Sequence, residues 1–344
     1  MISARNVHDF LPKGLDLLVS AGIPMPSRAG NVLTYPIPVE IVYEFPTERV
    51  LFWPERDANP WLHIFESLWM LAGRNDLAFL TQFVKRFEQF SDDGHTLAGA
   101  YGHRWRKHFH ERKATPVGVF PKPIDQIEQV VTLLKAEPFS RRAIITMFDP
   151  VEDLHTDEVS KDVPCNISIC FRVIYGKRDE ANRLDMTVIN RSNDLIWGLA
   201  GANAVHMSIL QEYIAAKLEL VVGYFRTYTT NLHAYEDVFA KTYRGALVAG
   251  VAPTSNPYTA GEVTPYPLIT NPTTWDRDLA LFFEDPAAYG YDNPFFPQVA
   301  KPLWFAHKAY KKKDIPAALE IASQCQASDW RRAATEWLQR RMKP

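Results

Sequence analysis

Polar and apolar residues alternate most clearly in the middle of the chain. Residues 166–173 alternate without interruption, which predicts a strand with one buried face. A turn-like stretch at 176–179 follows, and residues 183–190 alternate again as a second strand. A hairpin of this kind would bring Cys165, at the start of the first strand, close to Arg191, just after the second. The pattern therefore predicts a thiol and a guanidinium group side by side.

Elsewhere the apolar residues recur with a helical period. Residues 61–72 are apolar on almost every side and follow Asn59-Pro60, a typical helix start, so we expect a buried helix that ends at Gly73. Further helices are expected at 76–90, 124–134 and 203–218. Strands are expected within 31–53, at 143–148 and at 221–228, and irregular chain at 108–122 and 251–272.

This order of elements predicts an α+β fold, with a mixed or antiparallel sheet and long helices on one face. The last forty residues, from about Pro302, have the pattern of two amphipathic helices with a polar hinge near Ser328-Asp329. No glycine- or serine-rich linker, charge block or repeat divides the 344 residues. We therefore expect one main domain over residues 1–300 and a C-terminal helical extension over residues 301–344.

Composition narrows the class of protein. Apolar residues make up 47% of the chain, and 38 basic and 40 acidic residues give a net charge of −2. A nucleic-acid polymer or an anionic membrane needs a basic surface, so neither is expected as the main partner. Three cysteines do not make a disulfide framework, the first sixteen residues lack the apolar core of a signal peptide, and no run of about 18 apolar residues could span a membrane. We expect a soluble protein of a reducing cytoplasm.

Two residues have surroundings that suggest chemistry. A thiol beside guanidinium groups has a lowered pKa and reacts as a thiolate, which makes Cys165 a candidate nucleophile. Glu66 is a single carboxylate within an apolar helix, where burial should raise its pKa and suit it to proton transfer near neutrality. Cys170 lies on the same predicted strand as Cys165 without comparable neighbours, and we interpret it as structural.

Seven short motifs occur in the order and at the spacing of one enzyme family. They are Arg28-Ala-Gly30, the Glu66-Ser-Leu-Trp helix, Ala100-Tyr-Gly-His-Arg-Trp105, Ser140-Arg-Arg142, Pro164-Cys165-Asn, Arg191-Ser-Asn-Asp194 with Trp197-Gly-Leu199, and Asn231-Leu-His-Ala-Tyr235. Together they resemble thymidylate synthase and its relatives, the pyrimidine-nucleotide hydroxymethylases. The resemblance runs from about Arg28 to Asp285.

The resemblance implies the fold, the chemistry and the cosubstrate of that family. There a thiolate adds to C6 of a pyrimidine nucleoside 5′-monophosphate, and C5 then takes a one-carbon unit from 5,10-methylenetetrahydrofolate without a metal. By this resemblance Cys165 is the nucleophile, Glu66 organises water and protons around the base, and Tyr101 lies near the reacting carbon.

The resemblance also implies the binding residues. The phosphate clamp would be Arg28, Arg141, Arg142, Arg191 and Ser192. The base and sugar would be held by Asn203, Ala202, His233 and Tyr235, and the folate by Asp194, Gly198 and Phe87. Trp197 is interpreted as a packing residue. In the family the two arginines of Ser-Arg-Arg reach across from the other subunit, so the resemblance implies a homodimer with shared active sites.

Four departures from thymidylate synthase bear on the product. Asn166 follows the nucleophile in place of histidine, and Phe87 stands in place of a shielding tryptophan. Ala202 occupies the ungapped position of the base-reading asparagine, with Asn203 one residue later. An extension of about forty residues, ending at Pro344, replaces the short apolar closing tail. A less shielded site favours attack by water over hydride, so our main interpretation is a pyrimidine-nucleotide 5-hydroxymethylase of the viral or biosynthetic branch.

Two alternatives stay open. One is a methylating enzyme, either thymidylate synthase or a cytidylate methylase. The other is a nucleotide-binding regulator without turnover, which would have no need of Cys165, Glu66 and Tyr101. An asparagine amide can satisfy uracil or cytosine, so the base is undecided, as are the sugar and the role of the C-terminal extension.

Overall fold

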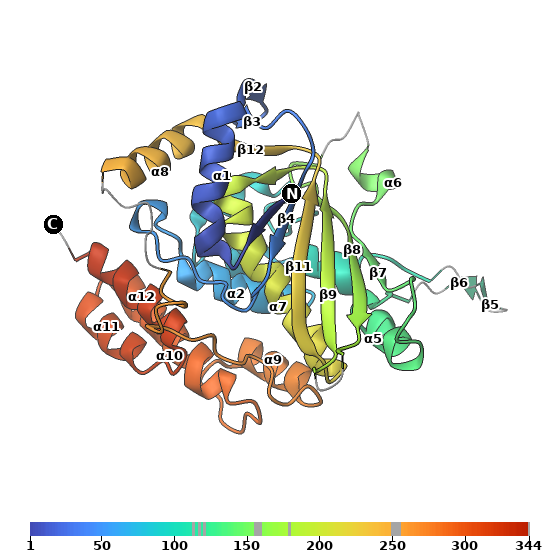
Figure 1. Cartoon of the computed structure of the whole chain (residues 1–344). Helices are drawn as coiled ribbons and strands as arrows, with labels where there is room; N and C mark the ends of the chain where they lie inside the picture. The colour runs from blue at the N-terminus through green and yellow to red at the C-terminus, as the bar shows by residue number, and fades with distance from the viewer. Residues whose placement is uncertain are drawn as a thin grey trace.

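A six-stranded mixed sheet forms the centre of the protein (Figure 1). The computed structural model describes residues 1–111, 114–115, 118–119, 122–154, 160–177, 180–248 and 256–342. The strands lie in the order β1 (Ile2–Ala4), β4 (Val39–Tyr43), β11 (Val221–Thr229), β9 (Arg183–Asn190), β8 (Asn166–Ile174) and β7 (Ile144–Thr146). β8 and β9 pair antiparallel, which confirms the predicted hairpin, whereas β9 and β11 pair parallel. The predicted α+β class and mixed sheet are therefore confirmed.

Helices cover one face of this sheet. The parallel strands β9 and β11 are joined through α7 (Ala202–Lys217), which is buried along most of its length and contacts α2 (Pro60–Leu71). Helix α2 begins where the sequence predicts, because Asn59 Oδ1 accepts a hydrogen bond from Leu62 N at 3.1 Å and Pro60 needs no donor in the first turn. Gly73 follows its end in the left-handed region, at φ +64°.

The opposite face of the sheet is only partly covered within one chain. On β7, Ile144 is 45% exposed. On β11, Tyr224 is 37% exposed and Tyr228 is 41% exposed. Cys170 on β8 lies on this face as well, paired with Ile144 on one side and Thr187 on the other. Large apolar side chains at this exposure make the face a candidate for contact with another protein surface.

A second, four-stranded sheet was not predicted, and it positions much of the candidate site. Its strands lie in the order β10 (Asn193–Asp194), β12 (Leu232–Tyr235), β3 (Gly30–Thr34) and β2 (Ile23–Ser27). β2 and β3 form a hairpin whose turn holds Arg28, and Gly30 closes it at φ +126°, in a region that favours glycine. Within the predicted range 31–53, β3 and β4 are the strands, and residues 44–53 form none.

The prediction of one amphipathic helix over 76–90 is wrong. The chain forms a single turn, α3 (Leu77–Leu80), and then a 3₁₀ segment, η2 (Lys85–Phe90). Val84 between them has extended backbone, and η2 buries none of its residues. Because no residue of η2 is fully buried, a longer helix here would gain little from packing.

The C-terminal extension holds three helices where two were predicted: α10 (Lys301–Lys311), α11 (Ile315–Ser323) and α12 (Ser328–Arg340). The first predicted helix breaks because Lys313 turns into the left-handed region and Asp314 caps a new helix through Ala317 N. Figure 1 shows these helices together at one side of the molecule, and α12 contacts α2. A domain boundary at residue 300 stays a prediction.

The remaining elements connect these layers. They are α1 (Val7–Ala21), η1 (Pro54–Arg56), α4 (Tyr101–Arg106), β5 (Ala114–Thr115), β6 (Gly118–Val119), α5 (Gln126–Ala136), α6 (Pro150–Asp153), η3 (Leu195–Leu199), α8 (Glu236–Val248), α9 (Trp275–Glu284) and η4 (Phe296–Ala300). Parts of the expected irregular stretches 108–122 and 251–272, and part of the turn 176–179, lie outside the described residues. In the part of the chain that is described, no helix is both long and apolar enough to cross a membrane.

Candidate active site

A cavity of about 960 Å³ lies between the helical layer and the four-stranded sheet. Ten of the predicted site residues line it: Arg28, Glu66, Phe87, Tyr101, Arg191, Ser192, Ala202, Asn203, His233 and Tyr235. Segments from residue 25 to residue 238 contribute to its wall, so the fold gathers motifs that are far apart in the sequence. A cavity of this size is in the range that small-molecule and cofactor sites occupy.

The hairpin places the candidate nucleophile beside an arginine. Arg191 N donates to Cys165 O at 3.0 Å, which closes the end of the β8–β9 ladder. Arg191 Nη2 lies 4.0 Å from Cys165 Sγ, and its Nε and Nη2 donate to the carbonyl oxygens of Pro164 and Val163 at 2.9 and 3.0 Å. These backbone contacts fix the guanidinium next to the sulfur, as the alternation pattern predicts.

The expected lowering of the Cys165 pKa is wrong for the isolated chain. Burial raises the pKa of this thiol, and the nearby carboxyl groups of Asp162 and Asp194 raise it further, against the lowering influence of Arg191 and Arg28. Asp162 is itself buried, and burial raises its pKa to about 6. The sequence-based prediction considered the arginines next to the sulfur. It left out the free-energy cost of removing a thiolate from water, which raises the pKa.

Glu66 and Tyr101 both line the cavity, and a histidine lies next to Glu66. Glu66 is buried in α2, and Tyr101 opens α4 with its pKa raised well above the ordinary value, chiefly by burial and also by the neighbouring Cys165. His206 of α7 was not predicted, although it is a polar residue within a mostly apolar stretch of the expected helix. Its Nε2 lies 3.3 Å from Glu66 Oε2.

The predicted phosphate ligands divide into two groups. Arg28 lies in the β2–β3 turn, where its Nη2 donates to Lys161 O at 2.9 Å, and Ser192 Oγ lies 3.4 Å from His233 Nδ1. These residues and Arg191 line the cavity, whereas Arg141 and Arg142 are exposed just before β7 and do not. Arg142 Nη2 instead pairs with Glu137 at 3.1 Å. Their role in phosphate binding stays a prediction.

Asn203 lines the cavity despite its offset from the family position. Its Nδ2 donates to Asn193 Oδ1 at 3.0 Å, which leaves the amide oxygen and one N–H for a ligand. Gly198 packs directly against this pair, because a Cβ there would lie 2.9 Å from Asn203 Nδ2 and closer still to Asn193 Oδ1. The glycine therefore allows the two amides to meet, whether or not it also contacts folate.

Trp197 of η3 lines the cavity, and Asp194 caps the start of η3 without lining it. Asp194 Oδ1 accepts hydrogen bonds from the backbone N–H groups of Ile196 and Trp197, and its Oδ2 is buried without a hydrogen-bond partner among the described residues. The interpretation of Trp197 as a packing residue is wrong. Trp197 is 48% exposed and lines the cavity, and the Arg56 guanidinium lies 5.2 Å from the centre of its ring.

Comparison with known proteins decides the family. The family model described as thymidylate synthase matches residues 47–246. The chain belongs to the thymidylate synthase family. It is 44% identical to the deoxyuridylate hydroxymethyltransferase of Pseudomonas phage M6 across 99% of this chain and 94% of that protein.

Other members of the family are similar over shorter stretches. The deoxyuridylate hydroxymethyltransferase of Bacillus phage SP01 is 38% identical over 58% of this chain and 50% of that protein. A putative thymidylate synthase of Methanothermobacter thermautotrophicus is 33% identical over 44% of this chain and 58% of that protein. The resemblance to the viral branch is confirmed, and the chain is a one-carbon transferase of a family that uses methylenetetrahydrofolate.

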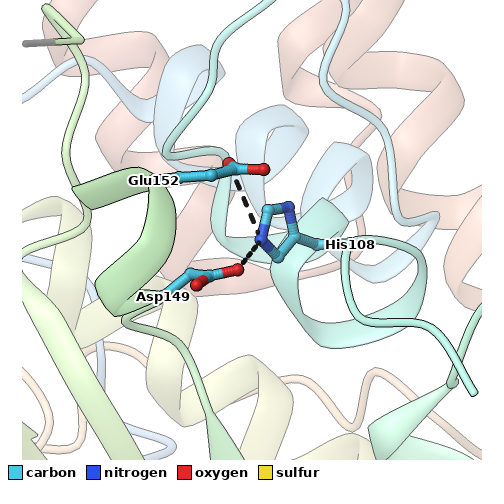
Figure 2. Close-up of side chains that lie close together, drawn as sticks. All are labelled: His108, Asp149 and Glu152. Carbon is cyan, nitrogen blue, oxygen red and sulfur yellow. Dashed lines mark hydrogen bonds and ion pairs between the residues drawn. The ribbon is translucent and has the colours of Figure 1, made fainter. Parts of the chain in front are cut away.

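One cluster outside the predicted site has the residue types of a metal centre. Figure 2 shows His108 Nε2 facing two carboxylates, with Asp149 Oδ2 at 3.0 Å and Glu152 Oε2 at 3.7 Å. The buried Arg104 places Nη1 3.0 Å from the same nitrogen and Nη2 2.9 Å from Asp153. The Arg104 guanidinium already supplies the positive charge that a metal ion would bring to these carboxylates. We therefore interpret the cluster as an ion-pair network.

Proposed function

We propose that this protein transfers a one-carbon unit from 5,10-methylenetetrahydrofolate to C5 of deoxyuridine 5′-monophosphate and releases the 5-hydroxymethyl nucleotide. The observation that carries the proposal is the similarity, over nearly the whole chain, to a protein named deoxyuridylate hydroxymethyltransferase. The cavity supports it, because a carboxylate, a tyrosine and the arginines Arg28 and Arg191 line it, and Arg191 Nη2 lies 4.0 Å from the thiol of Cys165. A regulator without turnover would not need that set.

The first step is attack of Cys165 Sγ on C6 of the uracil ring. The raised pKa means that the thiol is mostly protonated before substrate binds, so its proton passes to water in the site as the sulfur attacks C6. Arg191 Nη2, 4.0 Å from the sulfur, stabilises the negative charge as it forms. The sulfur–C6 bond turns the ring into an enolate, and C5 becomes the nucleophile.

The second step joins C5 to the methylene carbon of the folate. Loss of the C5 proton and departure of tetrahydrofolate then leave an exocyclic methylene on C5. Glu66 is the buried carboxylate that serves these proton transfers, and Tyr101 lies close enough to both Glu66 and Cys165 for their charges to affect it. Arg28, Arg191 and Ser192 hold the phosphate, and His233 and Tyr235 hold the sugar.

The third step decides the product. Phe87 lines the cavity where thymidylate synthases have tryptophan, so the methylene is less shielded than in a methylating enzyme. Water adds to it, and the folate leaves as tetrahydrofolate without being oxidised. Asn203 contacts the O4 and N3–H edge of uracil through the amide atoms that Asn193 leaves free.

We place the phosphate ligands Arg141 and Arg142 in the partner's site of a homodimer. The partly exposed face of the six-stranded sheet supports this arrangement, since β7 is its edge strand and both arginines precede β7. A second copy packed on this face would cover Ile144, Tyr224 and Tyr228. It would also bring its own arginine pair near the rim of the first copy's cavity.

Mass spectrometry of products tests the function. The protein is incubated with methylenetetrahydrofolate and, separately, with dUMP, dCMP, UMP or CMP. A mass gain of one CH2O unit on dUMP is the expected result. A gain of CH2 would identify a methylating enzyme, a preference for a cytosine nucleotide would change the substrate, and no product from any nucleotide would favour a binding protein.

A further inference from the structure

His206 borders the cavity from helix α7 and is almost fully buried. Its side chain is 2% exposed, and it lines the same cavity as Glu66 and Tyr101. Although Nε2 lies 3.3 Å from Glu66 Oε2, neither ring nitrogen has a hydrogen-bond partner among the described residues. Buried polar groups are almost always paired, so a ligand or water in the cavity is the expected partner of this imidazole.

The groups around His206 define what it can bind. Glu66 faces it from α2, and the imidazole of His63, also on α2, is close enough to influence it electrostatically. The pKa of His63 is held well below its ordinary value, chiefly by burial and also by Arg56, so His63 is neutral. A carboxylate and a ring nitrogen that are close but not aligned for a direct hydrogen bond can be bridged by one water.

The position of His206 on α7 relates it to the nucleotide base. Asn203 and His206 are three residues apart on one helix, so both lie on the face that borders the cavity. If Asn203 contacts O4 and N3–H of uracil, the ring atom C5 next to that edge would lie one turn further along α7, towards His206. A water held by His206 and Glu66 would then lie next to a substituent on C5.

We propose that His206 and Glu66 together bind the water that attacks the C5 methylene and take up its proton. The role of His206 rests on the proposed function. The water oxygen forms a bond to the methylene carbon, and one proton passes to the Glu66–His206 pair. The electron pair of the exocyclic double bond moves into the ring enolate, and its return expels Cys165 Sγ from C6. No oxidant or reductant takes part, and tetrahydrofolate has already left.

The test separates the water step from the steps before it. 5-Fluoro-dUMP cannot lose a proton from C5, so with methylenetetrahydrofolate it stops the reaction as a covalent adduct before water attacks. We expect His206→Phe to form this adduct at the wild-type rate, as measured by protein mass spectrometry. Turnover of dUMP to the hydroxymethyl product should fall roughly a hundredfold, the usual size of a general acid–base contribution.

Two further variants keep the test decisive. His206→Gln retains a hydrogen-bond donor and acceptor without taking up a proton, and it should turn over faster than His206→Phe but slower than wild type. His63→Gln removes the neighbouring buried imidazole, which does not line the cavity, and should leave the ratio of adduct formation to turnover unchanged. If His206→Phe does not fold, His206→Gln is compared with His63→Gln instead.

Three results would overturn the role of His206. They are unchanged turnover in the variants, an equal loss of adduct formation and turnover, or the same loss in His63→Gln. Wild type is assayed in parallel. If wild type itself releases a methyl nucleotide, the proposed function fails, whereas a hydroxymethylating wild type with a fully active His206→Phe contradicts only the assignment of His206.

Discussion

Arg191 Nη2 lies 4.0 Å from Cys165 Sγ, yet the pKa of the thiol is raised. Burial outweighs the guanidinium groups of Arg191 and Arg28, and the carboxyl groups of Asp162 and Asp194 act in the same direction as burial. The site of one isolated chain therefore holds its nucleophile as a thiol. In the proposed homodimer, the partner's arginines would add positive charge that favours the thiolate.

The nucleophile can be tested by a matched pair of substitutions. Cys165→Ser replaces the sulfur with a hydroxyl of much lower nucleophilicity, so nucleotide binding should remain while turnover falls to background. Cys170→Ser, in the strand that follows Cys165 and on the partly exposed face of the sheet, should keep near-normal activity. Product formation by each variant is measured under saturating substrate, and a Cys165→Ser variant with near-normal rates would contradict the mechanism.

Subunit complementation tests the shared site. Cys165→Ala and Arg142→Ala homodimers should each be inactive or nearly so. When the two are mixed and subunits exchange, each heterodimer has one site with both an intact thiol and an intact partner arginine. Part of the activity should return. Subunit exchange is verified by native mass spectrometry, and a lack of recovery after exchange would show that Arg142 does not act across the interface.

Base choice is predicted to depend on Asn203. Asn203→Asp replaces an amide with an acceptor-only carboxylate, which should penalise uracil and favour cytosine protonated at N3. Leaving a polar pair unsatisfied costs about 1–3 kcal/mol, so the ratio of kcat/KM for dUMP to that for dCMP should fall by roughly tenfold to a hundredfold. An unchanged ratio would mean that Asn203 only holds Asn193 and does not read the base.

The end of the C-terminal extension is clamped to the loop before α2. Arg341 Nη2 and Arg340 Nε lie 2.7 and 3.1 Å from the carboxylate of Asp57, and the Arg341 guanidinium stacks 3.2 Å from the Trp337 ring. Arg341→Ala should lower the free energy of unfolding by about 1–2 kcal/mol, since it removes an ion pair and a cation–π contact. Urea denaturation measures this change.

Lys312→Ala is the control for that measurement, because Lys312 is an exposed residue of the same extension. It should leave the free energy of unfolding unchanged. If Arg341→Ala unfolds at the wild-type urea concentration, the clamp does not stabilise the fold. A separate, earlier transition in Arg341→Ala would favour the predicted division at residue 300.

Sequence reasoning could predict the parts that follow from local patterns. The β8–β9 hairpin and helix α2 follow from alternation and capping, and both place their chemical residues as expected. The helix predicted over 76–90 breaks at Val84, whose backbone is extended, and the 3₁₀ segment that follows has no fully buried residue. The third C-terminal helix was missed because its boundary depends on the left-handed turn at Lys313.

The rest of the candidate site depends on contacts between distant segments. The four-stranded sheet joins residues near 30 to residues near 194 and 233, and no local pattern reveals that pairing. The Glu66–His206 contact likewise joins two helices that are far apart in the sequence. The pKa of Cys165 could not be derived from neighbours in sequence, since burial decides its direction.

The fate of the methylene tests the central claim most directly. Wild-type protein is given dUMP and methylenetetrahydrofolate in water enriched in heavy oxygen, and nucleotide and folate products are quantified together. The account predicts a 5-hydroxymethyl nucleotide that carries one heavy oxygen atom, with an equal amount of tetrahydrofolate. A methyl nucleotide formed together with an equal amount of dihydrofolate would show that hydride, and not water, reaches the methylene, and would contradict the account.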